Sequence, residues 1–466
     1  MNVRKMNQQE KVAYMLSQPV PKLVRQMAVP TIISMLVTSF YNMADTYFVG
    51  KINTQATGAV GIVFSVMALI QACGFFFGHG SGNFISRALG AGDYEEANRM
   101  AAVGFFSCFL VGLAASVLGI TFVTPFAKLL GSTPTILPYT KDYLRIILIG
   151  CPFSMSSLVL NNQLRFQGSA SYAMVGIVTG AILNIALDPF FIFSMEMGVA
   201  GAALATIISQ ITSFLLLLLM SRRGGNIRIR FSNFRPSAAF YREIFRGGFP
   251  SLCRQGLASL AHICLNHAAG LYAGAMADAA IAGMSIVSRI SMFANSALIG
   301  FGQGFQPVCG MNYGAKQYKR VREGFKFCVK TAVVFLVVIS VGGFVFAEKL
   351  VWFFRKEDAD VIRIGTLALK LHCVVFPFNA WIVICNMTLQ SIGKAAKASI
   401  LAAARQGIFF IPLIFLLPYF FGLLGVQMCQ TWSDALTLCV SIPMGLSVLK
   451  ELEQLEREKT VGQEKQ

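Results

Sequence analysis

Two aspartates, Asp45 and Asp188, lie inside long apolar stretches of the chain that could cross a lipid bilayer. A carboxylate in hydrocarbon is costly, so residues of this kind usually mark a path for ions or substrate. In a low-dielectric environment a carboxylate can also take up and release a proton near neutral pH. The two acids therefore indicate a site inside a membrane where a proton or a sodium ion could bind and leave.

Each acid has polar neighbours at helical spacing. Thr38, Tyr41 and Asp45 stand at positions i, i+3 and i+7, so they share one face of a helix. Asn184 and Asp188 are four residues apart and share a face in the same way. The proline that follows Asp188 removes a backbone hydrogen bond and favours a kink beside the acid. These spacings predict one polar face on each helix, and both faces could act on the same ion.

Asn161 and Thr206 are further polar residues within neighbouring apolar stretches, where they could line a cavity beside the ion site. The alternative is a polar cluster that only holds helices together, because side-chain hydrogen bonds also stabilise contacts between membrane helices. Two acids without an intramembrane cation in the same half of the chain favour the ion site. We expect no other metal site, since the cysteines and histidines form no ligand motif.

The elements that carry these residues are predicted to be transmembrane helices. Hydrophobic residues make up 55% of the chain and charged residues 13%, with a mean hydropathy of +0.64. In a soluble domain about a quarter of the residues are charged. Apolar runs of about 20 residues, enough to cross a bilayer, recur along the chain without the alternation of β-barrel strands. Twelve such runs lie at 24–48, 57–82, 98–124, 138–161, 170–193, 198–220, 247–272, 281–308, 324–347, 362–389, 398–420 and 425–448.

The chain consists of two similar halves. A set of glycines in the first half recurs 222 positions later, which pairs Gly78 with Gly300 and Gly82 with Gly304. Internal duplication is common in secondary transporters. The positions that match the two aspartates are apolar, so we expect acids in the first lobe alone. The predicted domains are a cytoplasmic segment (1–22), a first lobe with helices 1–6 (23–221), a basic cytoplasmic linker (222–246), a second lobe with helices 7–12 (247–448) and a cytoplasmic tail (449–466).

The net charge of +18 is distributed as in a multi-pass membrane protein. With the N-terminus in the cytoplasm, the cytoplasmic loops hold roughly three times as many Lys and Arg as the external loops, as the positive-inside rule requires. The basic linker is then a topology signal rather than a nucleic-acid site. No phosphate-binding glycine loop is present, so an ion gradient rather than ATP would drive uphill transport. We expect an inner-membrane or plasma-membrane protein, not an enzyme, with both termini in the cytoplasm.

At these polar residues the chain resembles the multidrug and toxin extrusion (MATE) family, in its bacterial branch with cation coupling in the N-terminal lobe. The resemblance covers both halves and rests on 30–50, with its Tyr-Asn-x-x-Asp-Thr core, on 184–189, and on 302–316, with Gly-x-Gly-Phe-Gln-Pro and Asn-Tyr-Gly-Ala-Lys. It implies an all-α integral membrane fold of twelve helices in two pseudo-symmetric six-helix bundles around a V-shaped cavity. The residues it implicates are Asp45, Asn184 and Asp188 for a proton or Na⁺, Thr38, Tyr41, Asn161 and Thr206 for the substrate cavity, and Pro30 for a bend in helix 1.

The sequence therefore predicts a secondary antiporter that exports amphipathic, cationic drug-like compounds in exchange for protons or sodium ions, and that contributes to antibiotic resistance. Its partners would be small organic cations and the bilayer, without nucleic acid, and it would need no cofactor besides the ion gradient. We expect a monomer. The alternative is a lipid-linked oligosaccharide flippase of related architecture, which should place several basic residues in its cavity. A channel or receptor is disfavoured by the duplication.

Two further expectations concern side chains inside the helices. The apolar walls of a pocket for drug-like cations would come from the first half. The candidates are Phe40, Tyr41, Met43, Phe64, Met67, Phe153, Met155 and Met174. In the second half, Arg254, Arg289, Lys330 and Arg405 are expected to snorkel to the membrane surface or to pair with neighbouring helices. A role in the cavity or in a gate is the alternative for these side chains.

Overall fold

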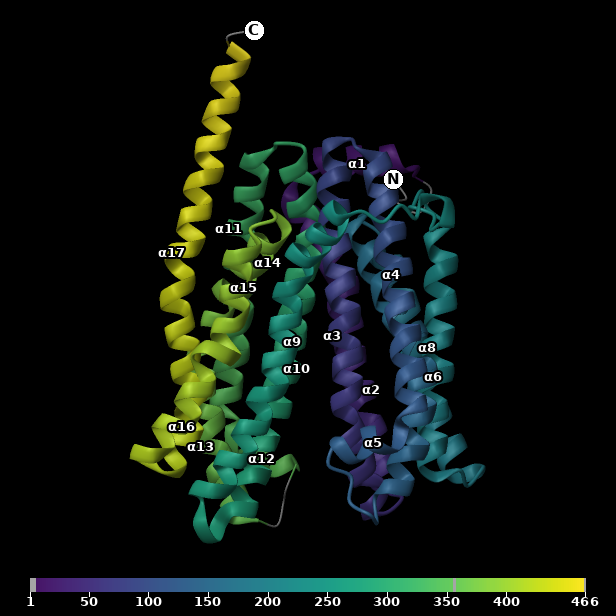
Figure 1. The fold of residues 1–466 in the computed structure, drawn as a ribbon. Coiled ribbons are helices and arrows are strands. Elements are labelled where there is room, and N and C mark those ends of the chain that lie inside the picture. Colours follow the sequence, from purple (N-terminus) through teal and green to yellow (C-terminus); the bar gives the residue numbers. More distant parts are fainter. Residues whose placement is uncertain (1–5, 355–357, 465–466) are drawn as a thin grey trace.

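The computed structural model describes residues 6–354 and 358–464, which form two bundles of α-helices standing side by side (Figure 1). These residues contain no β-strand. Within the described ranges, ten helices are long and apolar enough to cross a membrane, and the pair α13 (Ala359–Val375) and α14 (Phe378–Ser391), bent by 57°, makes an eleventh span. The helix α9 (Ala238–Tyr272) runs alongside them but is too polar to meet the same criterion. The predicted all-α membrane fold of twelve helices is confirmed.

The order of elements follows the predicted runs. The first bundle contains α2 (Val20–Gly50), α3 (Thr54–Ala91), α4 (Tyr94–Thr121), the short α5 (Val123–Leu129), α6 (Leu137–Phe166), α7 (Ala170–Pro189), the π-helical turn η2 (Phe190–Ser194) and α8 (Gly198–Ser221). The 3-10 turn η3 (Phe231–Asn233) lies in the connection to α9. The second bundle continues with η4 (Gly274–Met276), α10 (Ala277–Gly314), α11 (Tyr318–Val345), α12 (Ala347–Phe354), α13, α14, α15 (Ala395–Ala403), the π-helical turn η5 (Ala404–Ile408), α16 (Phe410–Phe421) and α17 (Leu423–Glu464).

The two bundles are in close contact near the end that carries both termini, where α3 packs on α9 and α2 packs on α10 (Figure 1). Glycines allow this approach. A Cβ atom at Gly80 would lie 2.3 Å from the carbonyl oxygen of Ile244, and one at Gly304 would lie 2.4 Å from Cα of Ala28. Small residues let helices approach closely. Part of the glycine set that the sequence repeats is therefore the packing surface between the bundles.

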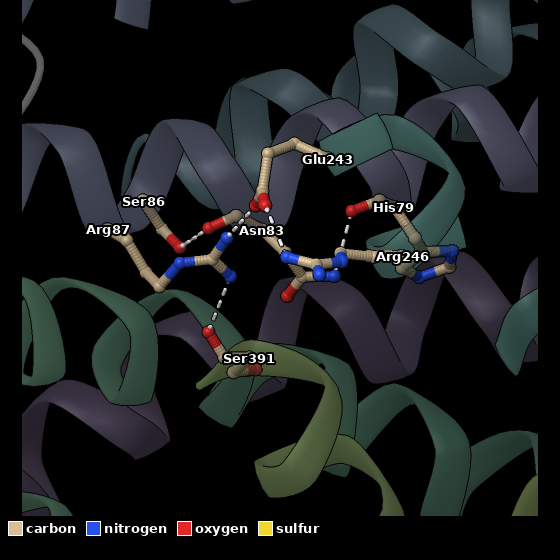
Figure 2. Close-up of polar contacts among 7 residues, drawn as sticks. All are labelled: His79, Asn83, Ser86, Arg87, Glu243, Arg246 and Ser391. Carbon is tan, nitrogen blue, oxygen red and sulfur yellow. Dashed lines mark hydrogen bonds and ion pairs between the residues drawn. The ribbon is translucent and has the colours of Figure 1, made fainter. Parts of the chain in front are cut away.

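An ion pair joins the bundles at the same end (Figure 2). Arg87 of α3 donates from Nη2 to Oε2 of Glu243 on α9 at 2.8 Å, and from Nη1 to the carbonyl oxygen of Ser391 on α14 at 3.1 Å. The side chains of Arg87 and Glu243 are 18% and 28% exposed. Because the pair is largely shielded from water and its partners come from different bundles, it stabilises the closed arrangement of this end.

Glu243→Gln is expected to loosen this closure. A hydrogen bond that involves a charged group is worth about 1.5–3 kcal/mol, so a loss of about 1–2 kcal/mol of it should raise the open fraction of this end roughly 5–30-fold. Amide hydrogen exchange of the purified protein, read in α3 near Arg87 and in α9 near Glu243, measures that change. The matched control is Glu95→Gln, because Glu95 pairs with Arg99 within α4 and joins no second bundle. Unchanged exchange in Glu243→Gln would show that the pair does not hold the bundles together.

The helix α1 (Gln8–Ser17), which precedes the first span, connects the two bundles at this end. Lys11 is 3% exposed and donates from Nζ to Ser169 at 2.9 Å and to Asn226 at 2.7 Å, both beside the first bundle. Arg320 at the start of α11 donates to the carbonyl oxygen of Gln18 at 2.5 Å. Burial lowers the pKa of Lys11 to about 8. The N-terminal segment is therefore packed against the bundles rather than freely solvated.

Candidate functional site

The structure brings Asp45, Asn184 and Asp188 together inside the first bundle. Asp188 is fully buried and Asn184 is 2% exposed. The Nδ2 atom of Asn184 donates to Asp188 Oδ1 and to the hydroxyl of Thr206, both at 3.4 Å. The carboxylate of Asp45 is close enough to Asp188 for the two charges to repel each other. Tyr41, one turn before Asp45 on α2, lies near both acids.

Three oxygen atoms of this cluster have no hydrogen-bond donor among the residues that the structure describes. They are Oδ1 of Asp45, Oδ1 of Asn184 and Oδ2 of Asp188, and each of these atoms is buried. An unpartnered buried acceptor costs about 1–3 kcal/mol, and more when the group is charged. A hard cation such as Na⁺ prefers carboxylate and amide oxygens, and a proton on either carboxyl would supply a donor. The cluster therefore has the chemistry of a proton or sodium site.

The local fold of α7 follows from its sequence. The α-helical part ends at Pro189, directly after Asp188, and the π-helical turn η2 follows it. Proline cannot donate the backbone hydrogen bond of a regular helix, and π-turns are frequent at functional sites. Beside the acid, the winding therefore changes from α-helical to π-helical.

A cavity of about 1510 Å³, including its open mouth, lies beside this cluster and between the bundles. All of the predicted cavity residues line it, namely Thr38, Tyr41, Asn161 and Thr206, together with Asn184. Asn161 is also held by the carbonyl oxygen of Ala173 at 3.0 Å. Residues of α9 and α10 form the opposite wall. The aspartates themselves lie behind Asn184 and Tyr41 rather than in the cavity lining.

The prediction for the apolar walls is largely wrong. Of the eight candidates only Tyr41 lines the cavity, whose apolar and aromatic lining includes Met35, Phe75 and Met292. Phe40 and Phe64 are 55% and 58% exposed, and Phe40 packs edge-on against Phe293 of α10, with 5.1 Å between the ring centroids. Hydropathy alone does not distinguish a side chain that faces lipid from one that faces a cavity.

Sequence reasoning also missed Tyr143 of α6. It is fully buried, lies near Asp45, Asp188 and Thr206, and its hydroxyl donates to Sδ of Met67 at 3.9 Å. A tyrosine early in an otherwise apolar run is the signal that could have found it, because a buried hydroxyl needs a polar partner. Tyr143 therefore belongs to the polar network behind the cavity.

Two expectations about charges are corrected by the structure. Acids are not confined to the first half, because Asp434 on α17 is fully buried in the second bundle. The first half does contain a buried cation, because Arg165 is 1% exposed in the last turn of α6 rather than in a loop. Arg165 donates to Asn162 at 2.6 Å and to Gln303 of α10. The first-half acids therefore share their bundle with a buried cation. The ion site is indicated by the unpartnered oxygens and not by the lack of an intramembrane cation.

The three second-half arginines have different environments. Arg405 pairs with Asp434 at 2.8 Å, which confirms helix pairing for this residue. Arg289 is exposed on the surface of α10, as snorkelling requires. Arg254 matches the alternative, because it lines the cavity from the second bundle, without an ion pair to any described residue.

Known proteins share the sequence and the fold. A model of the MatE family matches residues 30–190 and again residues 256–416, so the family unit occurs twice in the chain. The multidrug export protein MepA of Staphylococcus haemolyticus (strain JCSC1435) is 29% identical over 440 residues, which cover 93% of this chain and 95% of that protein. MepA of Staphylococcus aureus (strain MSSA476) is 27% identical over 419 residues, which cover 90% of this chain and 91% of MepA.

Solved structures agree in fold across both bundles. A MATE protein in complex with MaL6 superposes with a TM-score of 0.89 at 25% identity, covering 94% of this chain and 98% of that protein. An outward-facing multidrug resistance MATE family transporter of the MOP superfamily gives 0.87 at the same identity and coverage. With the family model matched in both halves, the chain belongs to the MATE family of multidrug efflux transporters.

Proposed function

We propose that this protein exports amphipathic, cationic drug-like compounds in exchange for protons or sodium ions. The observation that carries the proposal is the group of three unpartnered buried oxygens on Asp45, Asn184 and Asp188. A cation that binds there would remove an electrostatic cost, and its departure would restore it. Binding and release of an ion at this cluster would therefore change the stability of the helices that carry these residues.

The position of the cluster links the ion to the substrate. Asn184 lines the cavity and donates to Asp188, and Tyr41 lines the cavity and lies near both acids. A substrate cation in the cavity and a coupling ion at the acids would experience the same negative charge. Occupation of one site would then disfavour occupation of the other, which is the requirement for exchange.

The orientation in the membrane is part of the proposal. Both chain ends and the basic connection 222–237 lie at the end where the bundles are closed (Figure 1). Lys and Arg favour the cytoplasmic side of a membrane, so we place this end in the cytoplasm and the cavity mouth outside. We likewise propose residues 23–221 and 247–448 as the two moving lobes of a monomer in the inner or plasma membrane.

Pro30 is proposed as the bending point of α2. It is buried where α2 packs on α10, close to Gly300, at which a Cβ atom would lie 2.7 Å from Cα of Ile32. Because the contact leaves no room for a side chain, a bend of α2 here would change the packing between the lobes. The relatives named above are multidrug export proteins, so the lipid-linked oligosaccharide flippase is not favoured as the alternative.

The test is transport by the purified protein in liposomes, with the fluorescent cation rhodamine 123 outside. We expect uptake when the lumen is acidic or rich in sodium, because the outward flow of H⁺ or Na⁺ would drive the dye inward. Comparison of the two gradients identifies the coupling ion. Protein-free liposomes are the control. Uptake that is the same with and without both gradients would rule out exchange.

A further inference from the structure

The helix α9 has an unusual composition for its position. It extends through the second bundle beside α10, yet it lacks the apolar character that the other spans have (Figure 1). Its polar residues include Arg254, Gln255 and His262. All three line a cavity of about 1300 Å³ in the second bundle, and the first two also line the cavity beside the acid cluster. These three polar side chains of α9 are therefore directed into the cavities.

Arg254 carries a positive charge that no described acid neutralises. Its Nη1 donates to Oδ1 of Asn386 at 3.3 Å and its Nη2 donates to the hydroxyl of Ser251 at 3.4 Å. Both acceptors are neutral and both distances are long for hydrogen bonds of a guanidinium. By contrast, Arg405 on the same cavity has the carboxylate of Asp434 at 2.8 Å. Arg254 thus retains unused capacity to bind an anion.

The surroundings of Arg254 add no negative charge. The pair of Arg405 and Asp434 is neutral in sum, and the other polar residues that line the second cavity are amides, hydroxyls and histidines. Arg165 of the first bundle lies near enough to Arg254 for the two charges to repel. The wall formed by α9 is therefore positive, whereas the wall formed by α2 and α7 is backed by two carboxylates.

The two walls face one cavity. Asn184, which contacts Asp188, and Arg254 both line the space of about 1510 Å³ between the bundles. A guanidinium is planar and binds a carboxylate through two parallel hydrogen bonds. We propose that Arg254 binds the carboxylate of a zwitterionic amphipathic substrate, whose cationic group faces the acid cluster. Export of that substrate rests on the proposed function, but binding of the carboxylate at Arg254 does not.

The single free guanidinium of Arg254 favours a ligand with one negative charge over a more strongly anionic one. A pyrophosphate would need several cations, and Arg254 is accompanied in the lining only by an arginine that is already paired. A single carboxylate matches one free guanidinium in charge and in shape. Gln255 and Asn295, which line both cavities, supply neutral side-chain amides beside it.

The test compares two dyes that differ at one group. Rhodamine 110 carries a free carboxylate, and rhodamine 123 is its methyl ester. Fluorescence polarisation on the purified full-length protein in detergent gives Kd for each dye without any gradient. We expect Arg254→Gln to weaken rhodamine 110 about tenfold and to change rhodamine 123 less than twofold. Arg254→Lys should give an intermediate value for rhodamine 110, because it keeps the charge and loses the planar pair of donors.

The matched control is Lys330→Gln, which removes an exposed cation of α11 that lines neither cavity. Unchanged affinity for rhodamine 123 shows that Arg254→Gln is folded. Equal losses for both dyes would mean that Arg254 only supports the structure, and no loss for rhodamine 110 would mean that the carboxylate binds elsewhere; either result overturns the proposal. Because binding is measured without a gradient, failure of ion-driven uptake would contradict the proposed exchange and leave this test intact.

Discussion

Replacement of Asp188 by Asn is expected to reduce gradient-driven uptake of rhodamine 123 to the level of protein-free liposomes. The amide cannot take up a proton and is a weaker ligand than a carboxylate for Na⁺, so the ion would no longer bind and leave at this cluster. Asp45→Asn should have the same effect, because both acids contribute an unpartnered buried oxygen. The measurement is the liposome assay described above, with each variant reconstituted at equal density.

These losses would not reflect unfolding. The only hydrogen bond that Asp188 accepts from a described residue comes from Asn184, and it is long at 3.4 Å. An asparagine keeps the size of the side chain and removes the repulsion from Asp45, so the variant should be at least as stable as the original protein. The matched control is Asp142→Asn, an exposed acid of α6, which should retain full uptake. If both Asp45→Asn and Asp188→Asn retained it too, the coupling site would lie elsewhere.

The sequence predicted the acid cluster because local spacing determines which side chains share a helix face. Asn184 and Asp188 are one turn apart, and the structure indeed places both beside Thr206 and the cavity. Apolar length likewise predicted the spans, since a helix must bury its backbone polar groups across the whole bilayer. Both inferences depend on residues that are close together in the chain. There the spacing of polar residues and the length of the apolar runs are enough to predict the structure.

The sequence could not predict contacts between distant helices. The second-half positions that match the first-half acids are apolar, and Asp434 lies at neither of them. Its partner Arg405 is on a different helix, so no local pattern joins them. Arg165 lies beyond the predicted apolar run 138–161, so the sequence does not place it inside the membrane, although its partner Gln303 in the other bundle buries it. Such pairings depend on the packing of the bundles.

Arg405→Met is expected to destabilise the protein by about 3–5 kcal/mol, because it leaves the carboxylate of Asp434 buried without its cation. Asp434 is fully buried, and its remaining donors are the amides of Asn379 at 3.2 Å and Gln430 at 2.7 Å. Two neutral hydrogen bonds do not replace the ion pair in a region of low dielectric constant. Thermal unfolding of the purified variant in detergent should show the loss as a lowered Tm.

The double variant Arg405→Met with Asp434→Asn should recover most of that stability, because the neutral amide that replaces the carboxylate has no charge to leave unpaired and can still accept from both amides. Arg99→Met provides the comparison at the surface, where the exposed pairs with Glu95 and Glu96 should contribute about 0–1 kcal/mol. If Arg405→Met alone were as stable as the original protein, Asp434 would have to be neutral or solvated inside the second bundle. It would then be a second intramembrane acid able to exchange a proton, and coupling could no longer be assigned to the first bundle alone.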